Sequence, residues 1–160
     1  MLHALPLRDG AQDEFKNLFK NYYKELGCDE DCDHLLEEYI LPDLIAGVFR
    51  IDMLKEGEFF IGFVVYQIDE MGGEWSYKEG WGDIREIYIA PPYRKKGYGK
   101  FLLYTAEMKL KESGAQKAYC LPCESASPFF TACGYKKTEG YNDETDCFFY
   151  EKHDLNNKCT

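Results

Sequence analysis

Apolar residues recur with a helical period between residues 15 and 26 of the chain. Five of them, at spacings of three and four residues, would share one face of a helix: Phe15, Leu18, Phe19, Tyr22 and Leu26. We expect this helix to end near Gly27, because glycine commonly follows a helix terminus. A second helix is predicted at roughly His34–Leu44, interrupted near Pro42, since proline lacks a backbone N–H.

Shorter runs rich in β-branched and aromatic residues predict strands. The chain up to Ile89 contains four such runs: Leu2–Leu7, Val48–Leu54, Phe59–Ile68 and Ile84–Ile89. The turn KEGE joins the second run to the third, and a polar connection from Asp69 to Gly82 leads to the fourth. Pro91 and Pro92 end the fourth strand, because proline cannot continue a hydrogen-bonded ladder.

The last third of the chain alternates short strands with a short helix. Three strands are predicted there: Ala118–Leu121, Tyr135–Thr138 and Cys147–Lys152. The helix between the first two would be capped by Ser127, would carry Pro128 at its first position and would end at Gly134. Strands and helices in this order predict an α/β domain built around a mixed sheet.

The stretch YRKKGYGKFLL, residues 93–103, places cations and glycines directly before a further helix. Leu103, Ala106 and Leu110 form the apolar stripe of that helix, which would end at Gly114. The glycines at 97 and 99 permit positive φ and leave the backbone amides bare. Bare amides at a helix start, next to the cations at 94–96, form an anion site that suits phosphate. A solvated basic helix start without a ligand is the alternative.

Two common phosphate motifs do not fit this stretch. A Walker loop would need glycine and Ser or Thr where Arg94 and Phe101 stand. A dinucleotide-binding fingerprint would need Gly or Ala where Leu102 stands. The sequence therefore predicts a phosphate site of another kind.

Composition limits the function further. A chain of 160 residues suits one domain, and a net charge of −10 argues against a general nucleic-acid binder. The longest apolar block, FFIGFVVY, is too short to cross a bilayer, so no membrane is expected. No signal peptide is visible in MLHALPLRD, and seven cysteines are an odd number for a secreted disulfide framework. We expect a cytoplasmic protein with reduced thiols.

The cysteine spacing raises one alternative. Cys28 and Cys32 are four residues apart, Cys120 and Cys123 are three apart, and His34 lies near the first pair. Together these residues could form a zinc site. The two pairs lie far apart in sequence and one falls in a predicted strand, so ordinary thiols are preferred and no metal is expected.

The segment EIYIAPPYRKKGYGKFLL joins a strand, a proline turn, an Arg-x-x-Gly-x-Gly loop and a helix, and FFTACGY follows about 25 residues later. This combination resembles the GNAT superfamily of acyl-CoA-dependent N-acetyltransferases. The motifs cover about Asp83–Thr138, and the order of predicted elements agrees over the whole chain. The resemblance implies a GNAT-like central mixed, mostly antiparallel twisted β-sheet flanked by about four helices. It also implies one acetyltransferase domain at residues 1–152, with a polar C-terminal tail at 153–160.

Acetyl-CoA is the cosubstrate that the resemblance implies. Its pyrophosphate would lie on the amides of residues 97–100 beside the cations at 94–96, and its pantetheine arm would pair with the strand backbone at 87–89. Many members carry, before the glycine of the second motif, a Tyr that acts as general acid; here an apolar Phe would line the CoA instead. The residues assigned to the cofactor are Ile87, Tyr88, Ile89, Arg94, Lys95, Lys96, Gly97, Tyr98, Gly99, Lys100 and Phe130.

Transfer to an amine requires a group that removes a proton. Glu86 is the preferred base, because it lies within the strand that would hold the thioester. Asp83 is the second candidate and has the opposite strand parity, so it would face the other side of the sheet. A surface partnership with Arg85 or Lys78 is the alternative for Glu86.

The leaving thiolate needs little help, because a thiol has a pKa near about 8.5. Its proton could come from water, Tyr141 or Tyr119. The N–H of Tyr88 or of the next residue could stabilise the negative charge on the carbonyl oxygen. An acetyl-cysteine intermediate at Cys120 is disfavoured, because none of the histidines lies near it in sequence.

Two acidic segments border the expected acceptor cleft in this family, at Cys28–Asp33 and Glu139–Asp146. They favour a cationic amine as acceptor, either a small molecule or a protein amine, although acidic loops also serve solubility alone. The alternative function is a non-catalytic acetyl-CoA-binding sensor or interaction module. Both a monomer and a homodimer agree with the sequence.

Overall fold

The structure is a computed structural model that describes residues 1–7, 9–28, 31–73 and 75–157. The described residues form a seven-stranded sheet with the strand order β1-β2-β3-β4-β5-β7-β6. The chain packs as two compact units: unit 1 comprises Met1–Val65 and Glu86–Leu102, and unit 2 comprises Tyr66–Arg85 and the chain from Leu103 on. The α/β class with a mixed sheet is confirmed. The single domain at residues 1–152 stays a prediction, and part of the expected tail, 158–160, lies outside the described residues.

The strands pair mostly in antiparallel fashion. Their bounds are β1 Leu2–Pro6, β2 Arg50–Glu56, β3 Phe59–Ile68, β4 Gly82–Ile89, β5 Ala118–Cys120, β6 Lys136–Asn142 and β7 Cys147–Lys152. β1 is antiparallel to β2, and β7 is antiparallel to both β5 and β6. β4 and β5 are parallel, with Gly82 opposite Ala118 and Asp83 opposite Tyr119.

The helices agree with the apolar periodicity of the sequence. Their bounds are α1 Gln12–Glu25, α2 Cys32–Leu35, α3 Leu41–Ile45, α4 Tyr98–Glu112 and α5 Ser127–Ala132, with a π-helical segment η2 at Leu36–Ile40 and 3-10 turns η1 at Asp9–Ala11 and η3 at Pro91–Tyr93. None of the helices in the described part of the chain is long and apolar enough to span a membrane.

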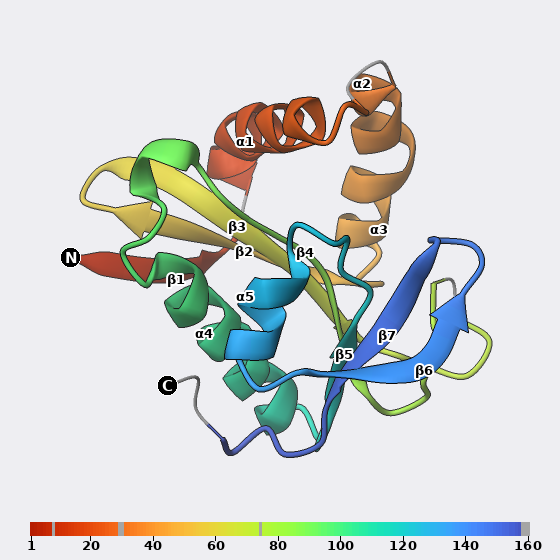
Figure 1. Ribbon diagram of the computed structural model, residues 1–160. Helices are drawn as coiled ribbons and strands as arrows, with labels where there is room; N and C mark the ends of the chain where they lie inside the picture. Colours follow the sequence, from red (N-terminus) through yellow and green to blue (C-terminus); the bar gives the residue numbers. More distant parts are fainter. Residues whose placement is uncertain (8, 29–30, 74, 158–160) are drawn as a thin grey trace. The chain divides into compact units, whose positions relative to one another are not determined.

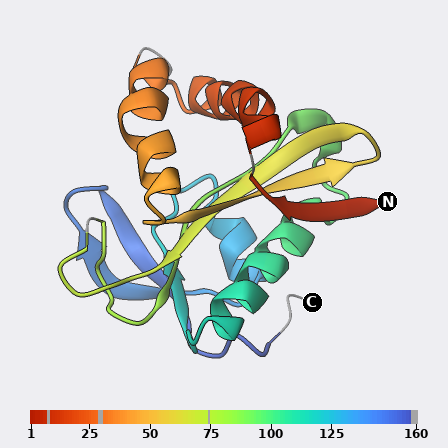
Figure 2. The same ribbon diagram turned by 180° about the vertical axis from the view of Figure 1, so that it is seen from behind.

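Unit 1 is organised around the apolar stripe of α1. Phe15, Leu18 and Phe19 are buried, and the Phe15 ring packs edge-on against Phe63 of β3, with ring centroids 5.1 Å apart. Each such side chain contributes about 1.5–3 kcal/mol by leaving water. Figure 1 shows α1 and the α2–α3 segment on one side of β2 and β3, and Figure 2 shows the same arrangement from behind. The stripe fades toward the end of α1, where Leu26 is exposed.

The second helical segment corrects the expectation of a break at Pro42. Helical residues run without interruption from Cys32 to Ile45, and Pro42 lies in the first turn of α3. The π-helical turn η2 directly precedes it. A wider turn before a proline accommodates the ring and the missing N–H, so the helix continues where a regular α-helix would break.

Strand and cap positions differ from the sequence prediction in unit 2. β4 begins at Gly82, where a Cβ would lie only 2.7 Å from the Leu110 side chain, so the strand start depends on a close helix contact. β6 continues to Asn142 through a polar sequence that pairs with β7 across an irregularity. Ser127 is not the cap of α5: Ala126 precedes the helix, and the Ser127 hydroxyl donates to the Glu124 carbonyl (3.0 Å).

A buried ion pair lies in the core of unit 2. The ammonium of Lys152 is 3.0 Å from Oε1 of Glu107, and both side chains are almost fully buried. The Tyr135 hydroxyl donates to the same carboxylate (2.7 Å). Burial raises the pKa of Glu107, while hydrogen bonds from Tyr135 and Lys152 oppose that increase. The apolar periodicity gave no indication of this cluster.

The cysteines agree only in part with the expectation of reduced thiols. Within the described residues, five cysteines are not in a disulfide: Cys28, Cys32, Cys120, Cys123 and Cys147. Cys133 is disulfide-bonded, so that expectation is wrong at this position. The described residues contain no group of three or more side chains arranged to hold a metal ion.

Candidate active site

The loop between β4 and α4 has the backbone geometry of an anion site. After η3, Lys95 has a φ of 62° and Gly97 a φ of 82°, and α4 then begins at Tyr98. Only glycine adopts positive φ without strain, which explains Gly97. Gly99 is the second residue of α4 and does not have positive φ, so the expected conformational role applies to one glycine and not to both.

The first turn of α4 presents its N–H groups at the end of a helix that is 15 residues long. The amide of Phe101 donates to the Gly97 carbonyl (3.1 Å). The amides at 98–100 precede it in the first turn, where an α-helix offers no carbonyl acceptor of its own. This turn carries no acidic residue. Lys96 stands near the ring of Tyr93, 5.8 Å from its centroid. These features suit a phosphate group at this terminus.

Tyr98 anchors the start of α4. Its hydroxyl donates to Oε1 of Glu56 at the end of β2 (2.6 Å), and this hydrogen bond is the largest cause of the raised pKa of the phenol. The side chain therefore points to β2, and its backbone amide is the group that remains for a phosphate.

The guanidinium of Arg94 is engaged within unit 1. Its Nη2 lies 2.7 Å from Oε2 of Glu25, and its Nε donates to the Ile89 carbonyl (2.7 Å). It also stands over the ring of Tyr88, 5.4 Å from the centroid, and the Tyr88 hydroxyl donates to Glu25 (3.2 Å). Arg94 thus ties the end of β4 to the last residue of α1. Sequence reasoning assigned Arg94 to the phosphate and did not find Glu25.

The backbone of β4 has one edge directed to β3 and the other directed away from it. The Ala90 amide donates to the Ile61 carbonyl of β3 (2.8 Å). Successive peptide groups of a strand point to opposite edges, so the polar groups of Ile89 and Ile87 point away from β3. That edge is where an extended pantetheine arm could add as a further strand.

Glu86, the preferred base, is half-buried on β4 and is joined to α1. The Tyr22 hydroxyl donates a hydrogen bond to Oε2 of Glu86. The Tyr22 ring packs against Tyr88 and Phe63, with centroid distances of 5.4 and 5.8 Å. Sequence reasoning counted Tyr22 only as part of an apolar stripe. The signal that could have found it is the phenol, which places one polar atom on an otherwise apolar face.

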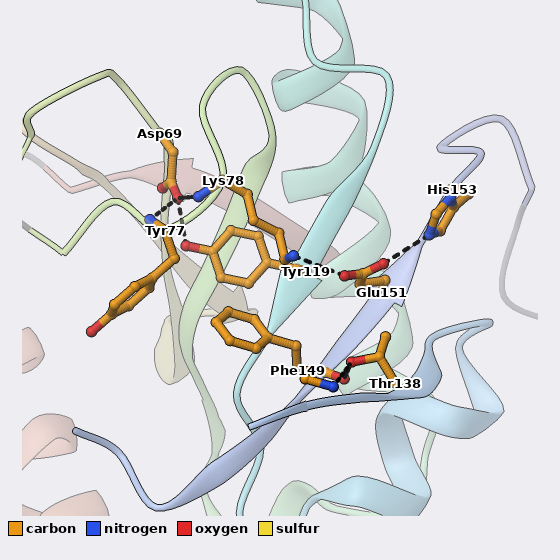
Figure 3. A network of polar contacts seen from close by, with 9 residues as sticks. Asp69, Tyr77, Lys78, Tyr119, Thr138, Phe149, Glu151 and His153 are labelled. Carbon is orange, nitrogen blue, oxygen red and sulfur yellow. Dashed lines mark hydrogen bonds and ion pairs between the residues drawn. The ribbon is translucent and has the colours of Figure 1, made fainter. Parts of the chain in front are cut away.

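Asp83, the second candidate base, and Tyr119, a candidate proton source for the thiolate, lie in unit 2. Asp83 is 6% exposed and faces Tyr119 across the β4–β5 pair. The Tyr119 hydroxyl donates to Oδ2 of Asp69 (2.5 Å), and burial raises its pKa far above the ordinary value. Figure 3 shows Asp69 as the centre of this network, where it also accepts from the backbone amides of Tyr77 and Lys78. Tyr119 is therefore a structural hydrogen-bond donor, which corrects its assignment as a proton source.

The remaining candidates of unit 2 differ in exposure. Phe130 is 4% exposed and packs edge-on against Tyr135, with ring centroids 5.5 Å apart, so it is part of the core of this unit. Tyr141 on β6 is 45% exposed and contacts Phe148. Cys120 is buried, and burial raises the pKa of its thiol well above the ordinary value, as expected for an inert strand thiol.

The two acidic segments are less loop-like than expected. Residues 139–142 belong to β6, and the turn is limited to 143–146, where Asn142 accepts hydrogen bonds from the amides of Glu144 and Thr145. In the other segment, Asp33 pairs with Lys20 (2.7 Å), and residues 29–30 lie outside the described residues. Of the predicted negative charge, that of Asp33 is therefore paired with a cation.

Comparison with known proteins agrees with this geometry. The family model described as acetyltransferase (GNAT) family matches residues 12–135. A PaiA N-acetyltransferase from Thermoplasma acidophilum, solved in complex with coenzyme A, is 15% identical, with a TM-score of 0.78 over 96% of this chain and 99% of that chain. A GNAT-family acetyltransferase from Staphylococcus aureus is 16% identical, with a TM-score of 0.76 over 97% and 99% of the two chains. No curated protein sequence matches significantly.

The family match covers well over half of the chain, so this protein belongs to the GNAT acetyltransferase family. The structural similarity, at identities this low, shows the fold. Membership of the family supports acyl transfer in general.

Proposed function

We propose that this protein is an N-acetyltransferase that transfers the acetyl group of acetyl-CoA to a primary amine by direct attack. One observation carries the proposal: unit 1 holds both a basic helix N-terminus at residues 94–100 and the carboxylate of Glu86 on the strand that leads to it. An anion site and a candidate base on one strand–loop–helix segment are what this transfer requires.

Different residues of unit 1 would bind different parts of acetyl-CoA. The amides of residues 97–100, with Arg94, Lys95 and Lys96, would hold the pyrophosphate, while the outward backbone of Ile87 and Ile89 would hold the pantetheine arm. Gly97 keeps the approach to the amides open, and the absence of acidic residues in the first turn of α4 fits a dianionic group. The cosubstrate supplies an activated thioester.

Glu86 would take a proton from the amine, so that the nitrogen attacks the thioester carbonyl as its C–S bond breaks. The N–H of Ile89, which points away from β3, would stabilise the charge on the carbonyl oxygen, whereas the N–H of Tyr88 points toward β3 by the same alternation. Water or Tyr141 would return a proton to the thiolate, which departs readily because its pKa is near about 8.5. Asp83, buried in unit 2, is the second candidate base.

The acceptor that we favour is a cationic amine, either a small molecule or a protein amine. Its support is the net charge of −10, together with the acidic residues that remain at the β6–β7 turn and near α2. We place the reaction in the cytoplasm, as expected from the sequence.

Release of free CoA thiol, measured with acetyl-CoA across a panel of primary amines, tests the proposal. Turnover with an amine, and none with matched alcohols, is the expected result. Tight CoA binding without turnover across the panel would overturn the enzymatic function.

One observation keeps a non-catalytic sensor as second candidate. Phe130 stands where many relatives have a phenol, and it is packed in the core of unit 2. A chain that only binds acetyl-CoA has no need of a general acid there.

A further inference from the structure

We propose that Tyr22 is a positioning residue for the catalytic carboxylate: its phenol holds Glu86 in the ionised form and in a fixed orientation for proton abstraction. The inference rests on the proposed function, because it takes Glu86 as the base. It gives Tyr22, on α1, a role in orienting Glu86 that membership of the family does not by itself imply.

The contact joins residues that are 64 positions apart in sequence. The Tyr22 hydroxyl, on α1, donates to Oε2 of Glu86, on β4. An ionised carboxylate only accepts hydrogen bonds, so a phenol that donates to it stabilises the charged form over the protonated one.

The phenol is held in place by surrounding rings. The Tyr22 ring contacts Tyr88, Tyr23 and Phe63, with centroid distances of 5.4, 5.4 and 5.8 Å. Packing on several sides restricts the rotamer, and a donor with a restricted rotamer orients its acceptor with little loss of entropy.

Packing alone does not account for a tyrosine at this position. Phe15 and Phe19 occupy the same stripe of α1 and are fully buried. A phenylalanine would fill the place of the Tyr22 ring equally well, but it would leave Glu86 without this donor. The hydroxyl is therefore the part of Tyr22 that the stripe does not explain.

The Tyr22→Phe variant removes the hydroxyl and keeps the ring. Without the donor, the ionised form of Glu86 is less stable relative to the protonated form. The acidic limb of the pH profile of kcat should therefore move up by about one pH unit. We expect kcat at neutral pH to fall about tenfold, with KM for acetyl-CoA within about twofold of wild type. Tyr23→Phe removes a neighbouring phenol of α1 and is the matched control, for which no shift of the limb is expected.

Two further measurements separate positioning from a structural role. In a Glu86→Gln background, Tyr22→Phe should cost no additional activity, because its effect passes through the carboxylate. Carbon-detected NMR titration of the Glu86 carboxyl in ligand-free protein should show a higher midpoint in Tyr22→Phe than in wild type or Tyr23→Phe. An unchanged midpoint overturns the positioning role. That titration needs no turnover, so an inactive wild type would overturn the proposed function while the titration still decides on Tyr22.

Discussion

The guanidinium of Arg94 pairs with the carboxylate of Glu25 at 2.7 Å, although 69 residues separate them in sequence. The pair joins the first residue of the expected phosphate loop to the last residue of α1. Both side chains are about two-fifths exposed, 42% and 39% respectively, so the pair itself contributes little to stability, about 0–1 kcal/mol. A phosphate group would therefore compete with Glu25 for the same guanidinium.

Glu25→Gln should raise the affinity for CoA by a few-fold, because Arg94 no longer has to leave a carboxylate before it contacts a phosphate. Arg94→Ala should lower the affinity, since a charge-assisted hydrogen bond contributes roughly 1.5–3 kcal/mol. Calorimetric titration of both variants with CoA measures the two effects. Weaker binding by Glu25→Gln would mean instead that Glu25 holds Arg94 in its binding position.

Glu86→Gln should lower kcat by about 10²–10⁴-fold, because an amide cannot accept the proton of the amine. Affinity for acetyl-CoA should change little, and the acidic limb of the pH–rate profile should disappear. Asp83→Asn provides the comparison. Activity in the Glu86 variant together with inactivity in the Asp83 variant would reverse the order of the two candidates, and full activity in both would exclude both.

Phe130→Tyr should change kcat only a few-fold, because the thiolate leaves well without a general acid. The new hydroxyl would enter the space beside Tyr135 and Phe129, where an unmet polar group costs roughly 1–3 kcal/mol. Steady-state rates and the midpoint of chemical unfolding measure the two effects. A gain of roughly a hundredfold in kcat, equivalent to about 2.7 kcal/mol, would show that a missing acid limits the native protein.

Lys152→Met should destabilise unit 2 by about 3–5 kcal/mol at neutral pH, because it leaves the buried carboxylate of Glu107 without its cation. Replacing both residues, Glu107→Leu with Lys152→Met, should recover most of that loss. Urea unfolding of the single and double variants checks the prediction. A double variant as unstable as Lys152→Met would contradict it.

The pH dependence of the Lys152→Met variant follows from the raised pKa of Glu107. Burial is the main cause of the increase, and the loss of Lys152 removes a contact that opposes it. The folded state then holds the proton more tightly than the unfolded state does. The stability of the variant should be highest below the ordinary carboxyl pKa of about 4.5 and should fall as pH rises through the folded-state value.

The periodic elements could be predicted from the sequence because their signal is local. The bounds of β3 and β7 were predicted correctly, and the stripe Phe15–Phe19 of α1 and the positive φ of Gly97 were as expected. The motif around residues 94–99 indicated the family only together with FFTACGY about 25 residues later, and the family is confirmed. Each of these features depends on neighbours within a few residues.

The polar contacts between elements far apart in the sequence were decided by the tertiary structure. Tyr22 with Glu86, Arg94 with Glu25 and Tyr119 with Asp69 join residues 64, 69 and 50 positions apart. Hydrophobic periodicity shows which face of an element is buried, but it does not show which polar atoms of two elements meet there. Hydrogen bonds form only within about 3 Å, and such distances arise only when helix and strand are packed together. The sequence alone therefore determined the family and the glycine loop before α4, whereas the partners of Glu86 and Arg94 were set by the packing of α1 on β4.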